Sequence, residues 1–272
     1  MLAITTLFGP DPGAVPDDPD DEHDERNADA ARRAAAHASL QVMLRDRQPR
    51  LIATPAILAV IGAIFVMMAA ASDSVAFPSQ TLLRWGGQSG SAIANGEWWR
   101  LLSPMWLHAN LLHLGLNALF LWRFGGYVER LLGPVVFLIV YLLAGVVASA
   151  VSLQFQASNG LSIGASGALF GLVGVLLTVA MTSRGRGGIG EMLAELRPNL
   201  VSIVLTNLIL GFLVSGIDNA AHIGGLAGGL VFGWLVGRHS LDATPSPRRT
   251  LIPIAMTAGL AAASILAVGW RQ

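Results

Sequence analysis

Residues 135–155 read VVFLIVYLLAGVVASAVSLQF and contain no charged side chain. A helix of this length can cross the roughly 30 Å hydrocarbon core of a bilayer. The composition agrees, because 53% of the 272 residues are hydrophobic and only 12% are charged, about half the charged fraction of a typical soluble domain. Similar runs predict an all-α polytopic membrane bundle with seven transmembrane helices, at residues 53–71, 108–124, 135–155, 165–182, 199–215, 219–237 and 250–269.

The distribution of arginine, the only basic residue type present, predicts the orientation of this bundle. If the N-terminus is cytoplasmic, 14 of the 17 basic residues fall in inside segments, and only Arg84, Arg100 and Arg271 fall outside. Positive residues concentrate in the cytoplasmic segments of membrane proteins. We therefore expect a multi-pass protein of the plasma or inner membrane with its N-terminus in the cytoplasm.

The chain divides into three parts by composition. Residues 1–50 hold nine of the 17 acidic residues between Asp11 and Asp29, which is typical of a disordered tail, and a short linker with a possible helix at 30–44 follows. Residues 51–240 form the six-span core. Residues 241–272 form a proline-rich, arginine-bearing linker and the seventh span.

Polar side chains recur at one depth of three predicted spans. Ser166 begins the fourth span, and His222 lies at the start of the sixth. His113 and Asn117, four residues apart, share one face of the second span. All three spans run from outside to inside in the predicted topology, so these side chains lie at similar depth below the outer surface. A hydroxyl, an imidazole and further polar donors at one depth favour acyl-transfer chemistry at a site that opens outward.

Ser166 taken alone has two interpretations. It lies among small residues that would let helices pack closely, so it could be a packing serine. A serine at a helix N-terminus also lies beside free backbone N–H groups, which would stabilise an oxyanion. The sequence Gly164-Ala165-Ser166-Gly167-Ala168 is not the G-x-S-x-G elbow of soluble hydrolases.

His222 favours function more strongly, because ionisable residues within spans are rare. The alternative is a structural histidine bonded to a backbone carbonyl. Glycines at a four-residue spacing after it, Gly224 and Gly228 among them, would let the sixth span approach the small face of the fourth. Asp218 suggests a triad, but we interpret Asp218 or Asn219 as the helix N-cap, which leaves a Ser–His dyad.

His113 and Asn117 are predicted to donate hydrogen bonds to an oxyanion; a structural hydrogen bond is the alternative. Metal binding is disfavoured because no glutamate follows His113, so H-E-x-x-H is absent, and the chain has no cysteine. No metal, nucleotide or organic cofactor is expected. His108 is interpreted as a residue that anchors the preceding loop.

Together these residues resemble the rhomboid intramembrane serine proteases, over residues 51–240. The resemblance rests on Trp99-Arg100, on His108, His113 and Asn117, on the Gly-Ala-Ser-Gly around Ser166, and on the Ala-His-Ile-Gly-Gly around His222. It implies a serine-type endopeptidase with Ser166 as nucleophile and His222 as general base. It also implies an oxyanion hole made by His113, Asn117 and the Ser166 N–H, with Gly164 in the same serine loop.

The resemblance further implies roles for supporting residues and for the substrate. Phe170 would pack on the catalytic histidine, Trp99-Arg100 would seat the first outer loop in the membrane, and the fifth span would be the gate for substrates. Substrates would be single-pass membrane proteins, cut in the bilayer near the outer end of their span, and no nucleic-acid partner is expected. The oligomeric state stays open.

Two other functions fit part of the sequence. A catalytically inactive rhomboid-like adaptor or chaperone would ordinarily lack the nucleophile or the base, and both are present. A small-solute transporter would be expected to show repeated halves and broken spans, and the chain has no internal repeat. The aspartyl type of intramembrane protease would need a pair of aspartates within the spans, and we find none.

Overall fold

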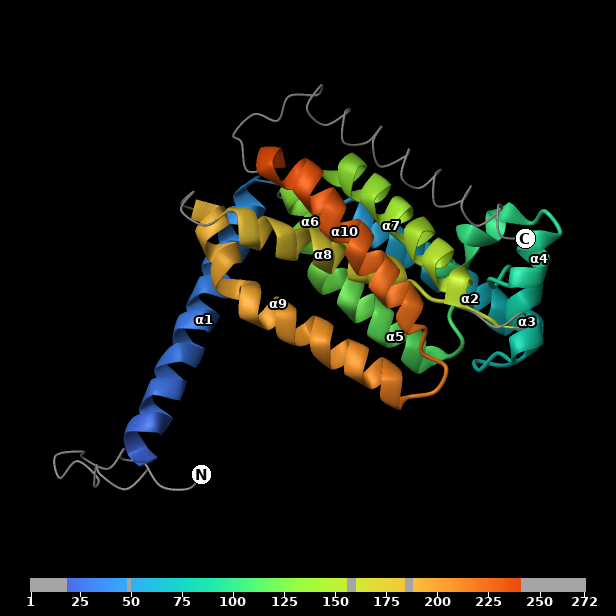
Figure 1. Ribbon diagram of the computed structural model, residues 1–272, viewed down its shortest axis with the longest axis horizontal. Coiled ribbons are helices and arrows are strands. Elements are labelled where there is room, and N and C mark those ends of the chain that lie inside the picture. Colours follow the sequence, from blue (N-terminus) through green and yellow to red (C-terminus); the bar gives the residue numbers. More distant parts are fainter. Residues whose placement is uncertain (1–18, 48–49, 156–159, 184–187, 241–272) are drawn as a thin grey trace, which may run out of the picture.

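The computed structural model describes residues 19–47, 50–155, 160–183 and 188–240, and this part of the chain is a bundle of helices (Figure 1). Between helices α5 and α6, the π-helical turn η3 keeps the helical segment continuous. The bundle contains α2 (Ala53–Ser72), α5 (Leu111–Phe120), η3 (Leu121–Gly125), α6 (Gly126–Leu132), α7 (Pro134–Phe155), α8 (Ser166–Thr182), α9 (Gly188–Leu213) and α10 (Asn219–Ser240). The predicted all-α class is confirmed.

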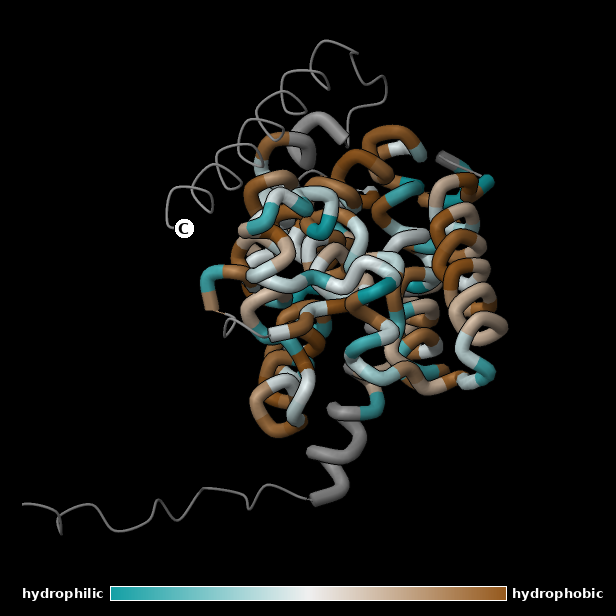
Figure 2. Tube along the Cα trace, turned by 90° about the vertical axis from the view of Figure 1, so that its right-hand side faces the viewer, coloured by the Kyte–Doolittle hydropathy of each residue, from teal (hydrophilic) through white to brown (hydrophobic). Residues whose placement is uncertain are grey.

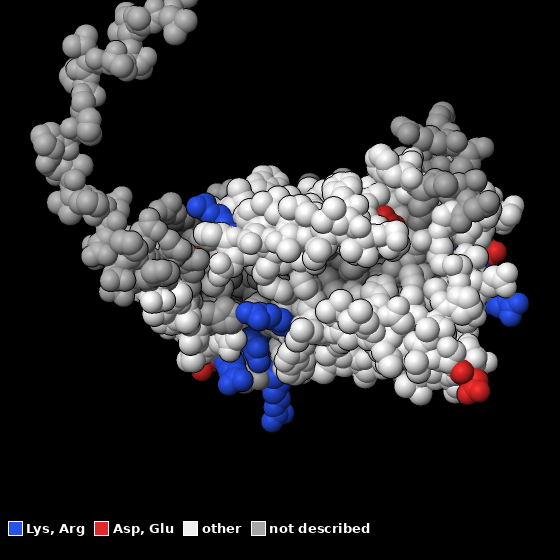
Figure 3. All heavy atoms as spheres, turned by 90° about the horizontal axis from the view of Figure 1, so that it is seen from below, with Lys and Arg blue, Asp and Glu red and all other residues white. Residues whose placement is uncertain are grey.

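The surface of the bundle suits a bilayer. Three helices among the described residues, α2, α7 and α9, are long and apolar enough to cross a membrane, and α8 is a shorter apolar helix. Figure 2 shows hydrophobic residues predominating along the helices. In Figure 3 the basic residues gather mainly toward the end where the helix α1 (Pro19–Arg47) lies, and a broad uncharged surface separates them from charges at the opposite end. The seventh predicted span, 250–269, lies outside the described residues.

Two predicted spans have different limits in the structure. The second begins at Leu111 rather than 108, because the Asn110 side chain caps the helix by accepting the His113 N–H at 2.9 Å. It then continues to Leu132 and ends at Gly133, which has a positive φ of 80°. The fifth begins at Gly188 rather than 199 and passes through Pro198.

Residues 19–29 of the N-terminal tail, for which the sequence predicts disorder, belong to the helix α1 (Pro19–Arg47) in the structure. Proline and acidic residues at its start and a run of alanines suit a helix. Leu40 and Leu44, four residues apart, are buried in the same core cluster as Leu193 and Leu196 of α9. This contact fixes α1 against the end of α9 where that helix begins.

The loop between α2 and α5 is built from short helices, α3 (Ser79–Arg84), α4 (Gly90–Ala94), η1 (Trp98–Leu101) and η2 (Ser103–Trp106). Arg100 is buried and holds this loop together. Its Nη1 donates to the carbonyls of Leu83 and Gly87 at 2.7 and 2.8 Å, and its Nε donates to Glu97 at 2.8 Å. Its guanidinium also lies 4.6 Å from the ring centre of the half-exposed Trp99.

Helices α8 and α10 pack closely because glycines line their contact, as their spacing predicts. A Cβ on Gly225 would overlap the Gly167 carbonyl oxygen, and one on Gly229 would overlap that of Gly171. The sequence also predicted Gly224 and Gly228 to face the fourth span, but they face Val151 and Val147 of α7. Two rows of glycine therefore seat α10 against both α8 and α7.

Candidate active site

The loop before α8 presents Ser166 as the first residue of that helix. Gly164 has a φ of +110°, which favours glycine, and its N–H donates to the Pro104 carbonyl at 2.9 Å. Ser162 pairs with Gln88 of the loop between α2 and α5 through two backbone hydrogen bonds. No side chain caps the N-terminus of α8, so its first backbone N–H groups lie beside the serine hydroxyl.

Ser166 and His222 lie in direct contact across the α8–α10 interface. The distance from His222 Nε2 to Ser166 Oγ is 2.9 Å. The Phe170 ring, one turn after the serine, stacks on the imidazole with centroids 4.3 Å apart and an interplanar angle of 9°. His222 is only 7% exposed, so packing restricts the orientation of its ring.

The Asp218 carboxylate caps α10, as expected for that residue, and takes no part in a triad. Its Oδ1 accepts the Ala221 N–H at 2.9 Å, and its Oδ2 accepts a hydrogen bond from Ser152 of α7. Among the described residues, His222 Nδ1 has no hydrogen-bond partner. The arrangement is therefore a serine–histidine pair without an orienting carboxylate.

His113 lies beside the serine loop. A Cβ built on Gly164 would be 2.7 Å from His113 Nε2 and 3.9 Å from Ser166 Oγ, so both atoms border one side of Gly164. Asn117 is buried, but its Nδ2 donates to the His113 carbonyl at 2.8 Å. Its role as an oxyanion donor stays a prediction.

His108 is 1% exposed and packs edge-on against the His113 ring, with centroids 5.1 Å apart. Neither of its ring nitrogens has a hydrogen-bond partner among the described residues. Contact with His113 therefore places His108 next to the site, where the sequence suggested only a loop anchor.

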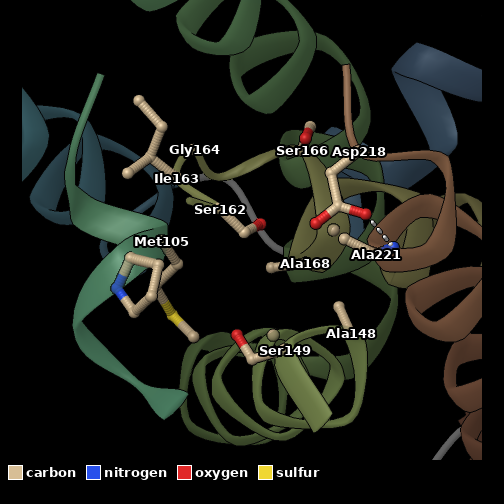
Figure 4. Close-up of a pocket in the computed structure, with 13 residues that line it drawn as sticks. Met105, Ala148, Ser149, Ser162, Ile163, Gly164, Ser166, Ala168, Asp218 and Ala221 are labelled. Atoms are coloured by element: carbon tan, nitrogen blue, oxygen red, sulfur yellow. Dashed lines mark hydrogen bonds between the residues drawn. The ribbon is translucent and has the colours of Figure 1, made fainter. Parts of the chain in front are cut away.

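A small cavity of about 20 Å³, enough for about one water molecule, adjoins Ser166. In Figure 4 the serine loop, η2, α7 and the start of α10 surround it. Ser149, Ser162 and Asp218 contribute polar groups to its wall, and Met105 and Gly145 contribute apolar ones. The sequence did not predict these lining residues, although the small residues Gly145, Ala148 and Ser149 lie on one face of a predicted span. Where the structure describes the chain, no three His, Cys, Asp or Glu side chains gather at a potential metal site.

Comparison with known proteins gives consistent matches. Residues 95–239 match the Rhomboid domain family. Over 151 residues, 56% of this chain, the sequence is 46% identical to the rhomboid protease GluP of Bacillus subtilis. It is 34% identical over 144 residues to YdcA of the same bacterium and 40% identical over 159 residues to RHOMBOID-like protein 4 of Arabidopsis thaliana. The matches cover 28%, 69% and 39% of those relatives' own lengths.

Proposed function

Because this chain belongs to the rhomboid family, we propose that it is an intramembrane serine endopeptidase that cuts other membrane proteins with Ser166 and His222. One observation carries the proposal, the 2.9 Å distance between Ser166 Oγ and His222 Nε2 at the start of two helices in a hydrophobic bundle. A nucleophile needs a base within this distance. A packing serine would not need an imidazole that a stacked ring holds in place.

The first half of the reaction forms an acyl-enzyme. Ser166 Oγ attacks the carbonyl carbon of the scissile peptide while its proton passes to His222 Nε2. The tetrahedral intermediate collapses by breaking the C–N bond, and Nε2 gives its proton to the leaving amine. The acyl group stays on Oγ as an ester. His222 must begin with Nε2 unprotonated and its proton on Nδ1.

Water completes the cycle. It attacks the ester carbonyl and gives a proton to Nε2, and the intermediate then releases the acid while Ser166 Oγ regains its proton from Nε2. In each half the negative charge on the carbonyl oxygen is stabilised by the first N–H groups of α8 and by His113, which borders the same loop. Donors of this kind are each worth about 3–4 kcal/mol in the transition state. Asn117 would join them once its amide turns from the His113 carbonyl.

The substrates that suit this site are single-pass membrane proteins. Ser166 lies in the outer half of the bundle if the arginine-rich end faces the cytoplasm, so cleavage falls near the outer end of a substrate span. The scissile segment must leave its helix, because a carbonyl within the helical hydrogen-bond ladder is not open to attack. Helix α9 exposes apolar residues along its second half, and it is the element through which a substrate span would approach.

The test uses the full-length protein purified and reconstituted in liposomes with a tagged single-span substrate. The wild type should cut near the outer membrane face, and Ser166→Ala and His222→Ala should each remove cleavage. A fluorophosphonate probe should label the wild type but not Ser166→Ala, which reports on the nucleophile without any substrate. A folded wild type that neither cuts nor labels, yet binds membrane helices, would favour an inactive adaptor instead.

A further inference from the structure

The cavity beside Ser166 contains one charged group among the described residues that line it, the carboxylate of Asp218. The other lining groups are small, apolar or neutral. Figure 4 shows Asp218 among the residues that line the cavity, with one carboxylate oxygen bonded to the Ala221 nitrogen. Asp218 is half-buried. The carboxylate therefore lies on the wall of the cavity that adjoins Ser166.

Two donors from two helices hold this carboxylate in place. The Ala221 N–H bonds Oδ1, and Ser152, whose side chain is fully buried in α7, donates to Oδ2. A carboxylate offers about four acceptor positions, so positions remain open after these two bonds. Helix capping accounts for the Oδ1 contact alone. It does not require a second donor from α7 or a position on the cavity wall.

We propose that Asp218 determines substrate specificity by favouring a lysine or arginine side chain close to the scissile bond; this inference rests on the proposed protease function. Attraction between opposite charges grows as the local dielectric falls, and a cavity within a membrane bundle has fewer waters to screen it. The fixed carboxylate loses little conformational entropy when a cation binds. An acidic side chain at the same position is repelled, which sharpens the discrimination.

The test measures kcat/KM for a panel of substrates with the reconstituted full-length protein. Each of the three residues on either side of the mapped cleavage site is in turn Ala, Arg or Glu. With the wild type, at least one position should favour Arg over Glu by about 10-fold or more. Asp218→Asn keeps an oxygen for the cap and removes the charge, and it should bring that ratio to within about 2-fold of unity.

Two variants serve as controls. Asp73→Asn removes an exposed acid that does not line the cavity, at a left-handed position (φ 48°) that asparagine tolerates, and it should keep the wild-type ratio. Ser152→Ala keeps the charge but removes one of the two donors that fix the carboxylate, and it should weaken the preference for Arg without removing it. If Asp218→Asn does not fold, Asp218→Ser removes the charge and retains a good N-cap.

The outcomes separate this inference from the proposed function. Cleavage of the Ala substrate without a charge preference at any position overturns the role of Asp218 and leaves the protease assignment intact. A preference for Arg that survives Asp218→Asn also overturns it, as does an equal loss for all substrates, which would indicate a structural role. If the wild type cuts no substrate, both proposals fail.

Discussion

Replacement of Gly164 by alanine tests whether His113 acts at the serine. Gly164 has a φ of +110°, and a side chain there should lower the free energy of unfolding by about 1–3 kcal/mol. The new methyl group would also lie 2.7 Å from His113 Nε2 and 2.8 Å from Cε1, so the ring must retreat to the ordinary contact distance of 3.4 Å or more. A displacement of this size at a catalytic group costs about 10- to 100-fold in rate.

The chain offers a matched control at Gly96. Its φ is +94°, but no atom lies within 4 Å of the position that a Cβ would take. Gly96→Ala should therefore lower the stability by a similar amount and leave cleavage close to the wild-type rate. Denaturant unfolding gives the stabilities, and single-turnover cleavage in liposomes gives the rates. If Gly164→Ala cuts within about 2-fold of Gly96→Ala, the placement of His113 does not matter for the reaction.

Two further changes test the frame that holds the site. Glu129 is fully buried and accepts hydrogen bonds from the N–H groups of Ile52, Ala53 and Thr54 at 2.6–2.8 Å. Glu129→Gln should therefore lower the free energy of unfolding by about 2 kcal/mol or more, as measured by denaturant titration. Equal stability of the variant and the wild type would show that the charge is dispensable. Gly225→Ala places a methyl group on the Gly167 carbonyl, and it should reduce both fluorophosphonate labelling and cleavage by about 100-fold. Gly62→Ala is the control, because open space surrounds that position, and it should label as the wild type does.

The helices and their contacts could be predicted where the sequence repeats a simple physical requirement. Long apolar runs must form helices in a bilayer because their backbone groups have no water to bond. Glycines four residues apart predicted the close contact of α10, and the structure places Gly225 on Gly167 as that spacing requires. The polar residues Ser166 and His222 stood out because the runs around them are apolar.

Other features depend on partners distant in the sequence and could not be predicted. Residues 19–29 are acidic and polar, yet the helix that contains them is fixed further along by Leu40 and Leu44, whose partners are in α9. The contact from Ser152 to Asp218 joins residues 66 positions apart. The side-chain amide of Asn117 donates a hydrogen bond to the His113 carbonyl of its own helix. Helix periodicity places Asn117 on the right face, but it cannot show whether the amide bonds the backbone or the site.

The packing of the bundle holds Ser166 and His222 on two helices that are fixed against each other. Ser166 and His222 lie on α8 and α10, whose glycine contacts leave no room for one helix to shift against the other. Neither residue lies on α9, which packs on α1 and α8 and exposes Leu205, Ile209 and Phe212 along its second half. The Asn219 side chain joins that second half to α10 through the Leu208 carbonyl at 3.0 Å. The contact between Ser166 and His222 therefore belongs to α8 and α10, and α9 contributes no atom to it.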